Sequence, residues 1–526
     1  MSSESYDYVV VGGGSAGAVI AARLSENPAV TVCLIEAGPS DVGNDDILIL
    51  DRWMHLLESE YDWDYPVEKQ ERGNSFLRHS RARILGGCSS HNSCIAFFAP
   101  KEDLDSWASE YGCTGWEASN VYRLFKKLET NEDKDAYHGH EGPVNIRNVP
   151  PVDPCGVALL DACEKMGIKR AKFNSPETVL NGANFFQINA RADGTRSSTS
   201  VSYLHPIMGK RRNLTVKTGF QAKKLIIDAS NKCTGVEVVG KGLTSTYDTI
   251  VNASREVIVS AGAIDSPKLL MLSGIGPATH LKELGIQVVA DSPGVGQNLQ
   301  DHPEGLIQWK AKKPMVQKST QWWEIGIFKT TKPGLKVPDL MFHYGNVPFD
   351  LHTVRQGYKT PKNAFCLTPN VTHARSRGTV KLRSSDYRDK PCVDPRYFTD
   401  PEGHDMSIMT TGIKMAREIV KQSPLSQWVG EEAYPGNKVQ TDAQIEEYIL
   451  KCHNTVYHPA CTVRMGSTTD NNAPLDHRLR VKGVKGLRVA DASIMPELVA
   501  VNPNITVMMI GERCAEMILE ENKSTL

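Results

Sequence analysis

The first 36 residues alternate apolar runs with a glycine-rich turn. Residues 6–11 read YDYVVV, a strand-like run, residues 12–17 read GGGSAG, and the AVIAARLSE that follows is typical of a helix. A second apolar run from Val30 to Ile35 leads to Glu36, 19 residues after Gly17. Strand, glycine turn, helix and strand together predict a β-α-β unit that ends in an acidic residue.

Three glycines of this turn have a physical role in dinucleotide binding. Gly12 permits a tight turn, Gly14 lets the backbone approach a pyrophosphate, and Gly17 lets the helix pack closely on the strand. Glu36 can accept hydrogen bonds from the ribose hydroxyls of an adenosine. The alternative is a structural turn without a ligand, but the complete context favours the dinucleotide site. The turn alone does not separate FAD from NAD.

Later segments predict further strands and two helices. Four strand-like runs, separated by short polar turns, lie in the middle of the chain at Leu214–Thr218, Lys224–Asp228, Gly235–Val239 and Glu256–Ser260. Residues 406–421 carry apolar side chains at helical spacing, which we interpret as core. Near the C-terminus, Asn502 and Pro503 form an N-cap and first-turn pair for a helix, whose positive end would lie next to Asn502.

Charge and targeting signals narrow the class of function. The 526 residues include 60 basic and 61 acidic side chains, so no net field favours nucleic acid or an anionic membrane. We find no secretory signal, no apolar stretch of membrane-spanning length, and no peroxisomal signal in the final Ser524-Thr525-Leu526. We therefore expect a cytoplasmic enzyme of two interleaved domains that acts on a small molecule, with no nucleic acid and no membrane as partner.

The cysteines and histidines show no metal-binding pattern. The 12 cysteines form no CxxC pair, which argues against a zinc site or a dense disulfide framework and favours reduced, buried thiols. His138 and His140 are close in sequence, but we expect no third ligand near them. His453 and His458 are five residues apart in a predicted loop. We therefore expect no metal site.

Several longer segments resemble the glucose–methanol–choline (GMC) oxidoreductase family. Residues 81–92, RARILGGCSSHN, and 262–277, GAIDSPKLLMLSGIGP, look like its two sequence signatures. GVGQNLQDHPEG from Gly294, YHPACTVRMG from Tyr457 and RVADASIMPELVAVNPNIT from Arg488 match in the expected order, so the resemblance covers essentially the whole chain. Members that oxidise choline are the most similar, through DRWM at Asp51, SSHNSCIAF at Ser89, STQWWEIGIF at Ser319 and HNTVYHP at His453.

The resemblance implies an α/β fold, α+β overall, with a Rossmann-like FAD-binding domain and a substrate-binding domain whose antiparallel sheet covers one face of the flavin. FAD as the cofactor, rather than NAD, follows from this resemblance, as does a homodimer. The implied boundaries are 1–151, 193–303 and 456–526 for the discontinuous FAD-binding domain, and 152–192 and 304–455 for the substrate-binding domain.

The resemblance also implies catalytic roles. A flavin alcohol oxidase needs a base for the hydroxyl proton and donors that hold the forming alkoxide while a hydride passes to flavin N5. His458 in the YHP motif matches the active-site histidine of the family, and Asn502 matches its usual His or Asn partner. His343 resembles a second histidine that hydrogen-bonds the substrate oxygen, and Ser93 matches a serine near flavin and alcohol. The alternatives are core histidines, a helix cap and backbone capping.

His91 lies where choline-oxidising members carry a histidine joined to the flavin 8-methyl group, next to Asn92 in the same cofactor-binding motif. The resemblance therefore implies a covalent 8α-N-histidyl FAD. The tether would withdraw electron density from the ring and so raise the redox potential of the flavin. The alternative is a noncovalent histidine that lines the pocket.

A quaternary ammonium offers no hydrogen-bond donor, so its recognition requires charge and aromatic faces. Glu304 in DHPEG supplies a carboxylate, and Trp53, Trp323 and Tyr457 match the aromatic wall of the choline-oxidising members. An isolated tryptophan is more often part of a core, but the four matching positions together favour the cage. Val456 resembles an apolar residue beside flavin C4a, where oxygen reacts.

These features predict oxidation of choline through betaine aldehyde to glycine betaine, with oxygen reduced to hydrogen peroxide. Three alternatives stay open: a choline dehydrogenase with another electron acceptor, an oxidase of other primary alcohols, and a relative that uses flavin only structurally. Cys461 departs from the pattern because the family more often has a glycine there, which suits a positive φ. We assign Cys461 no catalytic role.

Overall fold

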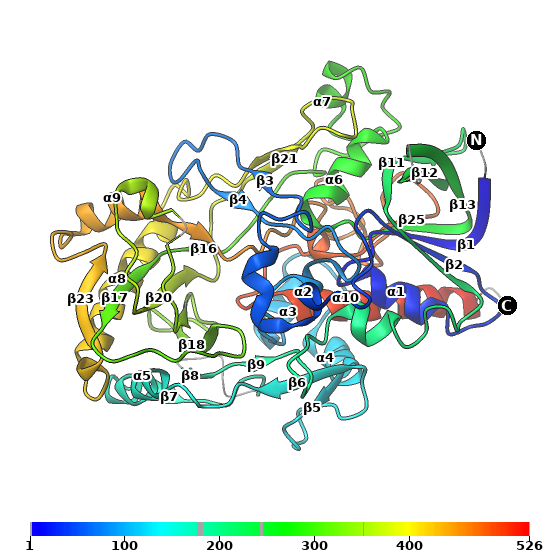
Figure 1. The fold of residues 1–526 in the computed structure, drawn as a ribbon. Coiled ribbons are helices and arrows are strands. Elements are labelled where there is room, and N and C mark those ends of the chain that lie inside the picture. Colours follow the sequence, from blue (N-terminus) through cyan, green and yellow to red (C-terminus); the bar gives the residue numbers. More distant parts are fainter. Residues whose placement is uncertain (1–2, 176–181, 242–245, 351, 525–526) are drawn as a thin grey trace.

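The computed structural model describes residues 3–175, 182–241, 246–350 and 352–524, and it contains two large sheets (Figure 1). In the described residues, the first sheet has seven strands in the order β10-β2-β1-β13-β12-β11, with β25 paired to β13. Their bounds are β10 Leu214–Thr218, β2 Val32–Glu36, β1 Ser3–Val11, β13 Thr246–Val259, β12 Cys233–Lys241, β11 Phe220–Ile227 and β25 Leu487–Val489. Strand β1 pairs in parallel with β2 and β13, whereas β11, β12 and β13 are antiparallel.

The second sheet lies on the left of Figure 1. Within the described part of the chain it has nine strands, with β23-β17-β20-β19-β18-β8-β7 as its main path and β16 joining β20 to β24. Their bounds are β23 Val429–Tyr434, β17 Ile307–Ala311, β20 Ala364–Val371, β19 Leu340–Gly345, β18 Trp323–Lys329, β8 Gly182–Phe185, β7 Lys169–Arg170, β16 Pro303–Glu304 and β24 Asn454–Thr455. Apart from the parallel pair β7 and β8, neighbouring strands are antiparallel, as expected for the substrate-side sheet.

Ten α-helices and four small sheets of two or three short strands complete the described part of the chain. The helices are α1 Gly17–Leu24, α2 Asp45–Leu48, α3 Lys101–Ser109, α4 Ala118–Leu128, α5 Pro154–Lys165, α6 Gly262–Leu272, α7 Ala278–Glu283, α8 His404–Lys421, α9 Asp442–Cys452 and α10 Asn504–Ser524. The short strands are β3 Tyr65–Pro66, β4 Arg78–His79, β5 Glu129–Asn131, β6 Val144–Asn148, β9 Gln187–Ile188, β14 Ile275–Gly276, β15 Ala290–Asp291, β21 Thr379–Lys381 and β22 Cys392–Asp394. Among the described residues, no helix combines the length and apolar character that crossing a bilayer requires.

The predicted β-α-β unit is confirmed as β1, α1 and β2. A glycine is required at both ends of its turn: Gly12 has φ 101°, and a Cβ at Gly17 would lie 2.0 Å from the Gly12 carbonyl oxygen. Helix α1 therefore begins in direct contact with the turn, and its buried apolar residues pack on the sheet.

The predicted run at Leu214–Thr218 is confirmed as β10, and residues 406–421 lie within α8. The other three strands exist, but their predicted bounds are wrong, because β11, β12 and β13 extend further along one antiparallel ladder. Exposed polar positions such as Asp248 continue that ladder, since backbone pairing needs no apolar side chain.

The prediction of Asn502 as a helix N-cap is wrong. Helix α10 begins at Asn504, and the carbonyl of Pro503 accepts the first hydrogen bond, from Val507. Asn502 therefore stands before the helix, and its side chain turns to His458 instead.

Candidate functional site

A cavity of about 490 Å³ collects residues from distant parts of the chain and from both sheets. Its lining includes all the predicted site residues except Gly17, which lies beneath the turn: Gly12, Gly14, Glu36, Trp53, His91, Asn92, Ser93, Glu304, Trp323, His343, Val456, Tyr457, His458 and Asn502. Residues spread over almost 500 positions of sequence therefore meet at one site.

One part of the cavity suits a dinucleotide. The carboxylate of Glu36 accepts hydrogen bonds from the backbone N–H groups of Gly13, at 2.9 Å, and Gly38, at 2.7 Å. Burial raises the pKa of Glu36 to about 7, although these N–H groups oppose the shift. A Cβ at Gly87 would lie 2.6 Å from the Gly14 Cα, so two glycine segments face each other closely. Because these glycines have no side chains, their backbone is accessible to a ligand. Together with the Glu36 carboxylate, which is held in place, it fits the phosphates and ribose of FAD.

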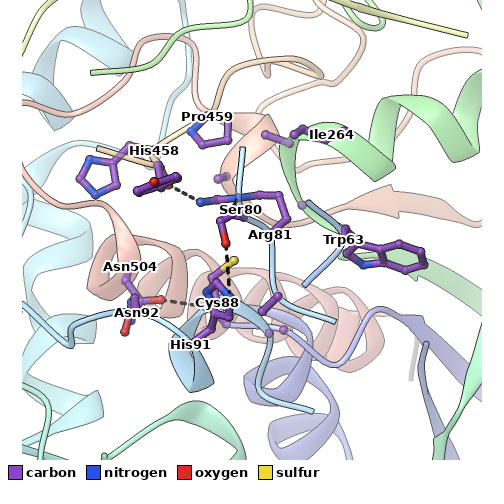
Figure 2. Close-up of a pocket in the computed structure, with 18 of the residues that line it drawn as sticks. Trp63, Ser80, Arg81, Cys88, His91, Asn92, Ile264, His458, Pro459 and Asn504 are labelled. Carbon is purple, nitrogen blue, oxygen red and sulfur yellow. Dashed lines mark hydrogen bonds between the residues drawn. The ribbon is translucent and has the colours of Figure 1, made fainter. Parts of the chain in front are cut away.

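His91 follows a 3-10 turn over Gly87–Ser90 and is buried. Its Nε2 lies 3.4 Å from Ser80 Oγ (Figure 2). The same nitrogen lies 3.8 Å from the carboxylate of Asp62, which accepts a hydrogen bond from Ser80. Burial lowers the pKa of His91 to about 4 despite that carboxylate. The imidazole is therefore neutral at physiological pH and keeps a lone pair for bond formation.

His458 lies between two nitrogen-bearing side chains. Its Nδ1 is 2.9 Å from Nδ1 of His302, and its Nε2 is 3.4 Å from the amide nitrogen of Asn502. Because an amide nitrogen only donates, His458 Nε2 must accept, and the ring proton lies on Nδ1, shared with His302. Burial, with smaller contributions from His302 and His343, lowers the pKa of His458 well below its ordinary value. His458 is thus a neutral imidazole whose Nε2 can accept a proton.

The backbone around His458 is held in place by two contacts. Its N–H donates to Asp301 Oδ1 at 2.8 Å, and the guanidinium of Arg81 hydrogen-bonds to the carbonyl of Tyr457. Tyr457 has φ 62°, a left-handed conformation that is uncommon for an aromatic residue. Arg81 comes from the same signature segment as His91, so the two halves of the site are joined directly.

Glu304 is the carboxylate of an aromatic-lined part of the cavity and is 6% exposed. Its Oε2 accepts a hydrogen bond from the Asn454 amide at 3.3 Å, and its Oε1 lies 3.7 Å from His343 Nδ1. The ring of Trp323 lies edge-on to His343, with centroids 6.5 Å apart, and packs against Phe349 at 5.0 Å. A buried carboxylate beside aromatic faces can bind a cation that has no hydrogen-bond donors.

Trp53, Asn92, Ser93 and Val456 are the remaining predicted residues of the cavity. The Nε1–H of Trp53 donates to the Gln321 carbonyl at 2.9 Å, which fixes the orientation of its ring. Asn92 Oδ1 accepts a hydrogen bond from the backbone of Cys94, so this side chain stabilises the turn beside His91. Ser93 and Val456 line the cavity.

Sequence reasoning missed His302, Asn454, Arg81 and Phe349. His302 and Arg81 lie inside quoted family segments, and this position was the only available signal. Asn454 also lies inside a quoted segment, HNTVYHP, but nothing there marks its contact with Glu304, which arises from strand pairing. Phe349 lies outside the quoted segments, and its role arises from ring packing.

Cys461 confirms that this position uses a positive φ. Its φ is 74°, and the side chain is fully buried. The cysteine therefore occupies the left-handed conformation that the family's usual glycine would adopt without strain.

The expectation that no further ligand-type side chains lie near His138 is wrong. Asp133 and Asp135 place carboxylate oxygens within 4.8 Å of a His138 ring nitrogen. The ammonium of Lys172 forms ion pairs with Asp133 at 3.1 Å and with Asp135 at 2.8 Å, so a lysine already balances the charge of these two carboxylates. None of these residues lines the cavity.

Comparisons with known proteins cover the whole site. Two family models, both described as GMC oxidoreductase, match residues 6–304 and 374–511. A choline oxidase from Arthrobacter globiformis is 65% identical over 521 residues, which cover 98% of this chain and 95% of that protein. Mitochondrial choline dehydrogenase from Homo sapiens is 34% identical over 563 residues, which cover 98% of this chain and 90% of that protein. The crystal structure of pyridoxine 4-oxidase from Mesorbium loti has a TM-score of 0.89 at 30% identity and covers 98% of this chain and 99% of that one.

Proposed function

The chain belongs to the GMC oxidoreductase family, and from this we propose that it is an FAD-dependent choline oxidase. The observation that carries the choline assignment is the buried Glu304 carboxylate in an aromatic-lined cavity that also holds His458. The 65% identity to a choline oxidase supports the same substrate and favours oxygen as the acceptor over the dehydrogenases at 34%.

FAD would be held by the glycine turn, by Glu36 and by His91. Gly12 and Gly14 leave room for the pyrophosphate, and Glu36 receives the ribose hydroxyls. The neutral His91 imidazole is suited to a covalent bond with the flavin. When bound, the flavin supplies the acceptor for a hydride from the alcohol carbon.

His458 acts as the base in this proposal. Its unprotonated Nε2 removes the hydroxyl proton of choline, and the resulting imidazolium shares its Nδ1–H with His302. Asn502 holds the ring of His458 in place through its amide. His343 and Ser93 serve the forming alkoxide as hydrogen-bond donors.

Glu304, Trp53, Trp323 and Tyr457 bind the trimethylammonium group. Each cation–π contact contributes about 0.5–2 kcal/mol when the cation is desolvated. A fixed head group orients the alcohol carbon and hydroxyl relative to His458, which reduces the entropy lost on reaching the transition state.

The product of the first oxidation, betaine aldehyde, is oxidised again as its hydrate, so the final product is glycine betaine. Each oxidation transfers two electrons to oxygen and gives one hydrogen peroxide. Val456 supplies an apolar surface beside the reacting centre, where oxygen can enter. The domain division at residues 151/152, 192/193, 303/304 and 455/456 and a homodimeric assembly are parts of the same proposal.

An anaerobic choline titration followed by admission of air tests the proposal. Choline should bleach the flavin absorbance without any added dye, and air should restore it with release of hydrogen peroxide. Bleaching that air does not reverse would favour a dehydrogenase, whereas bleaching by simple primary alcohols but not by choline would assign another substrate. A flavin that no alcohol reduces would contradict an oxidase.

A further inference from the structure

We propose that Asn370 is a positioning residue that keeps the proton of His343 on Nε2, so that His343 donates a hydrogen bond to the substrate oxygen. The inference rests on the proposed function, because it concerns the same alcohol site. It goes beyond that function by assigning a role to a residue that lies outside the motifs and does not line the cavity.

Strand pairing places Asn370 next to the site. In the sheet, Glu304 of β16 pairs with Asn454 of β24 on one side and with Asn370 of β20 on the other. The carboxylate therefore stands between two amides, both almost fully buried. Asn454 donates to Glu304 itself, at 3.3 Å. The amide nitrogen of Asn370 instead lies 3.3 Å from Nδ1 of His343, on the adjacent strand β19.

This contact determines which ring nitrogen of His343 carries the proton. An amide nitrogen can only donate, so Nδ1 of His343 accepts and has no proton of its own. A neutral imidazole has one N–H, which must then be at Nε2. His343 lines the cavity, and its Nε2 has no protein hydrogen-bond partner among the described residues. The Nε2–H is therefore available to a ligand in the cavity.

Glu304 exerts the opposite influence on the same nitrogen. Its Oε1 lies 3.7 Å from His343 Nδ1 and would accept a hydrogen bond if that nitrogen carried the proton. Without the Asn370 amide, the ring proton would therefore move to Nδ1, toward the carboxylate, and Nε2 would become an acceptor. His343 could then no longer stabilise the alkoxide by donation.

His458 and His343 thus both direct Nε2 to the site, but this nitrogen is unprotonated in His458 and protonated in His343. Asn502 donates to Nε2 of His458 and leaves that nitrogen bare, whereas Asn370 donates to Nδ1 of His343 and leaves its Nε2 protonated. The amide of Asn502 thus makes His458 the base, and the amide of Asn370 makes His343 the hydrogen-bond donor.

The direct test is the protonation state of His343 in the holoenzyme. Nitrogen NMR of protein labelled with ¹⁵N-histidine distinguishes a protonated from a bare ring nitrogen, and the His343 signals are assigned by their loss in His343→Gln. We expect a protonated Nε2 in the unmodified protein and transfer of the proton to Nδ1 in Asn370→Ala. A protonated Nδ1 in the unmodified protein would overturn the proposal without requiring any variant to fold.

Anaerobic flavin reduction gives the functional readout, with Asn454→Ala as the matched truncation on the other side of Glu304. Asn370→Ala should slow reduction by about 10- to 100-fold for choline and for its uncharged tert-butyl analogue alike, less than or equal to the loss of a direct oxyanion donor. Asn454→Ala should mainly weaken binding of choline. An Asn370→Ala enzyme that reduces at the normal rate, or loses only choline affinity, would overturn the role of Asn370. Failure of choline to reduce the unmodified enzyme would instead refute the proposed function.

Discussion

Replacement of Glu304 by glutamine isolates the charge of the head-group site. Glutamine has nearly the same shape and keeps an oxygen for the Asn454 amide, so the contact at 3.3 Å can persist. What disappears is the negative charge of a side chain that is 6% exposed and therefore only weakly screened by water. Choline and its tert-butyl analogue have nearly equal shapes, and only choline carries a charge.

The size of the effect follows from the electrostatics of a partly desolvated pair. At about 5 Å and an effective dielectric constant of about 20, two unit charges attract by roughly 3 kcal/mol. Breaking a buried charge pair costs roughly 2–5 kcal/mol, which corresponds to an increase of about 30- to several thousand-fold in the dissociation constant of choline. Binding of the neutral analogue should change much less, because its interaction with the site is apolar.

The concentration dependence of anaerobic flavin reduction measures binding of both alcohols in both enzymes. The unmodified enzyme should prefer choline clearly, and Glu304→Gln should remove most of that preference. Equal losses for the two alcohols would mean that the substitution damaged the cavity. An unmodified enzyme that binds both alcohols equally would refute the charge-recognition argument altogether.

Three further outcomes are expected. Acid-precipitated protein should remain yellow, and His91→Ala should release its flavin into the supernatant; free flavin from the unmodified protein would exclude the covalent bond. His458→Ala should slow anaerobic reduction at least ~10²-fold while flavin stays bound, and near-normal reduction would show that another group is the base. Burial lowers the pKa of His79 to about 4 and of His453 to about 3, so the unfolded chain binds more protons than the folded one below about pH 6.5. The free energy of unfolding should therefore fall as the pH drops from about 6.5 towards 4 and be insensitive to these two groups above that range; urea titrations at several pH values, with a shallower fall in His453→Asn, check this.

The nucleotide half of the fold was predictable because its constraints are local. The turn between β1 and α1 needs Gly12 and Gly17 for steric reasons that a short sequence window reveals. The ends of β11 and β13 were not predictable, since an antiparallel ladder can continue through exposed polar residues once backbone pairing has begun. Asn502 had the sequence of a helix cap, but its contact with His458 is tertiary and left no local signal.

The glycine turn and Glu36 were predicted from the local pattern, and the other residues of the candidate site through the family resemblance. The structure gathers all of them in one cavity apart from Gly17. The residues that orient them were not predicted. Asn454 lies 150 positions from Glu304, and Asn370 reaches His343 only because β19 and β20 pair in one particular register. Sequence patterns indicate which face of a strand is buried, but the register between distant strands depends on the whole sheet.

The contact between the first and last helices has a consequence for biosynthesis. Ser15, at the glycine turn, donates to Asn504 at 2.8 Å, and Arg23 of α1 pairs with Glu512 of α10, across 489 positions in each case. A ribosome must therefore complete nearly the entire chain before the N-terminal segment meets its packing partner. Until then the side of α1 that packs against α10 stays uncovered, so the nascent chain depends on a late, long-range contact to complete its fold. Cells that make this enzyme faster than they can protect such chains should accumulate it first as aggregates of apoprotein.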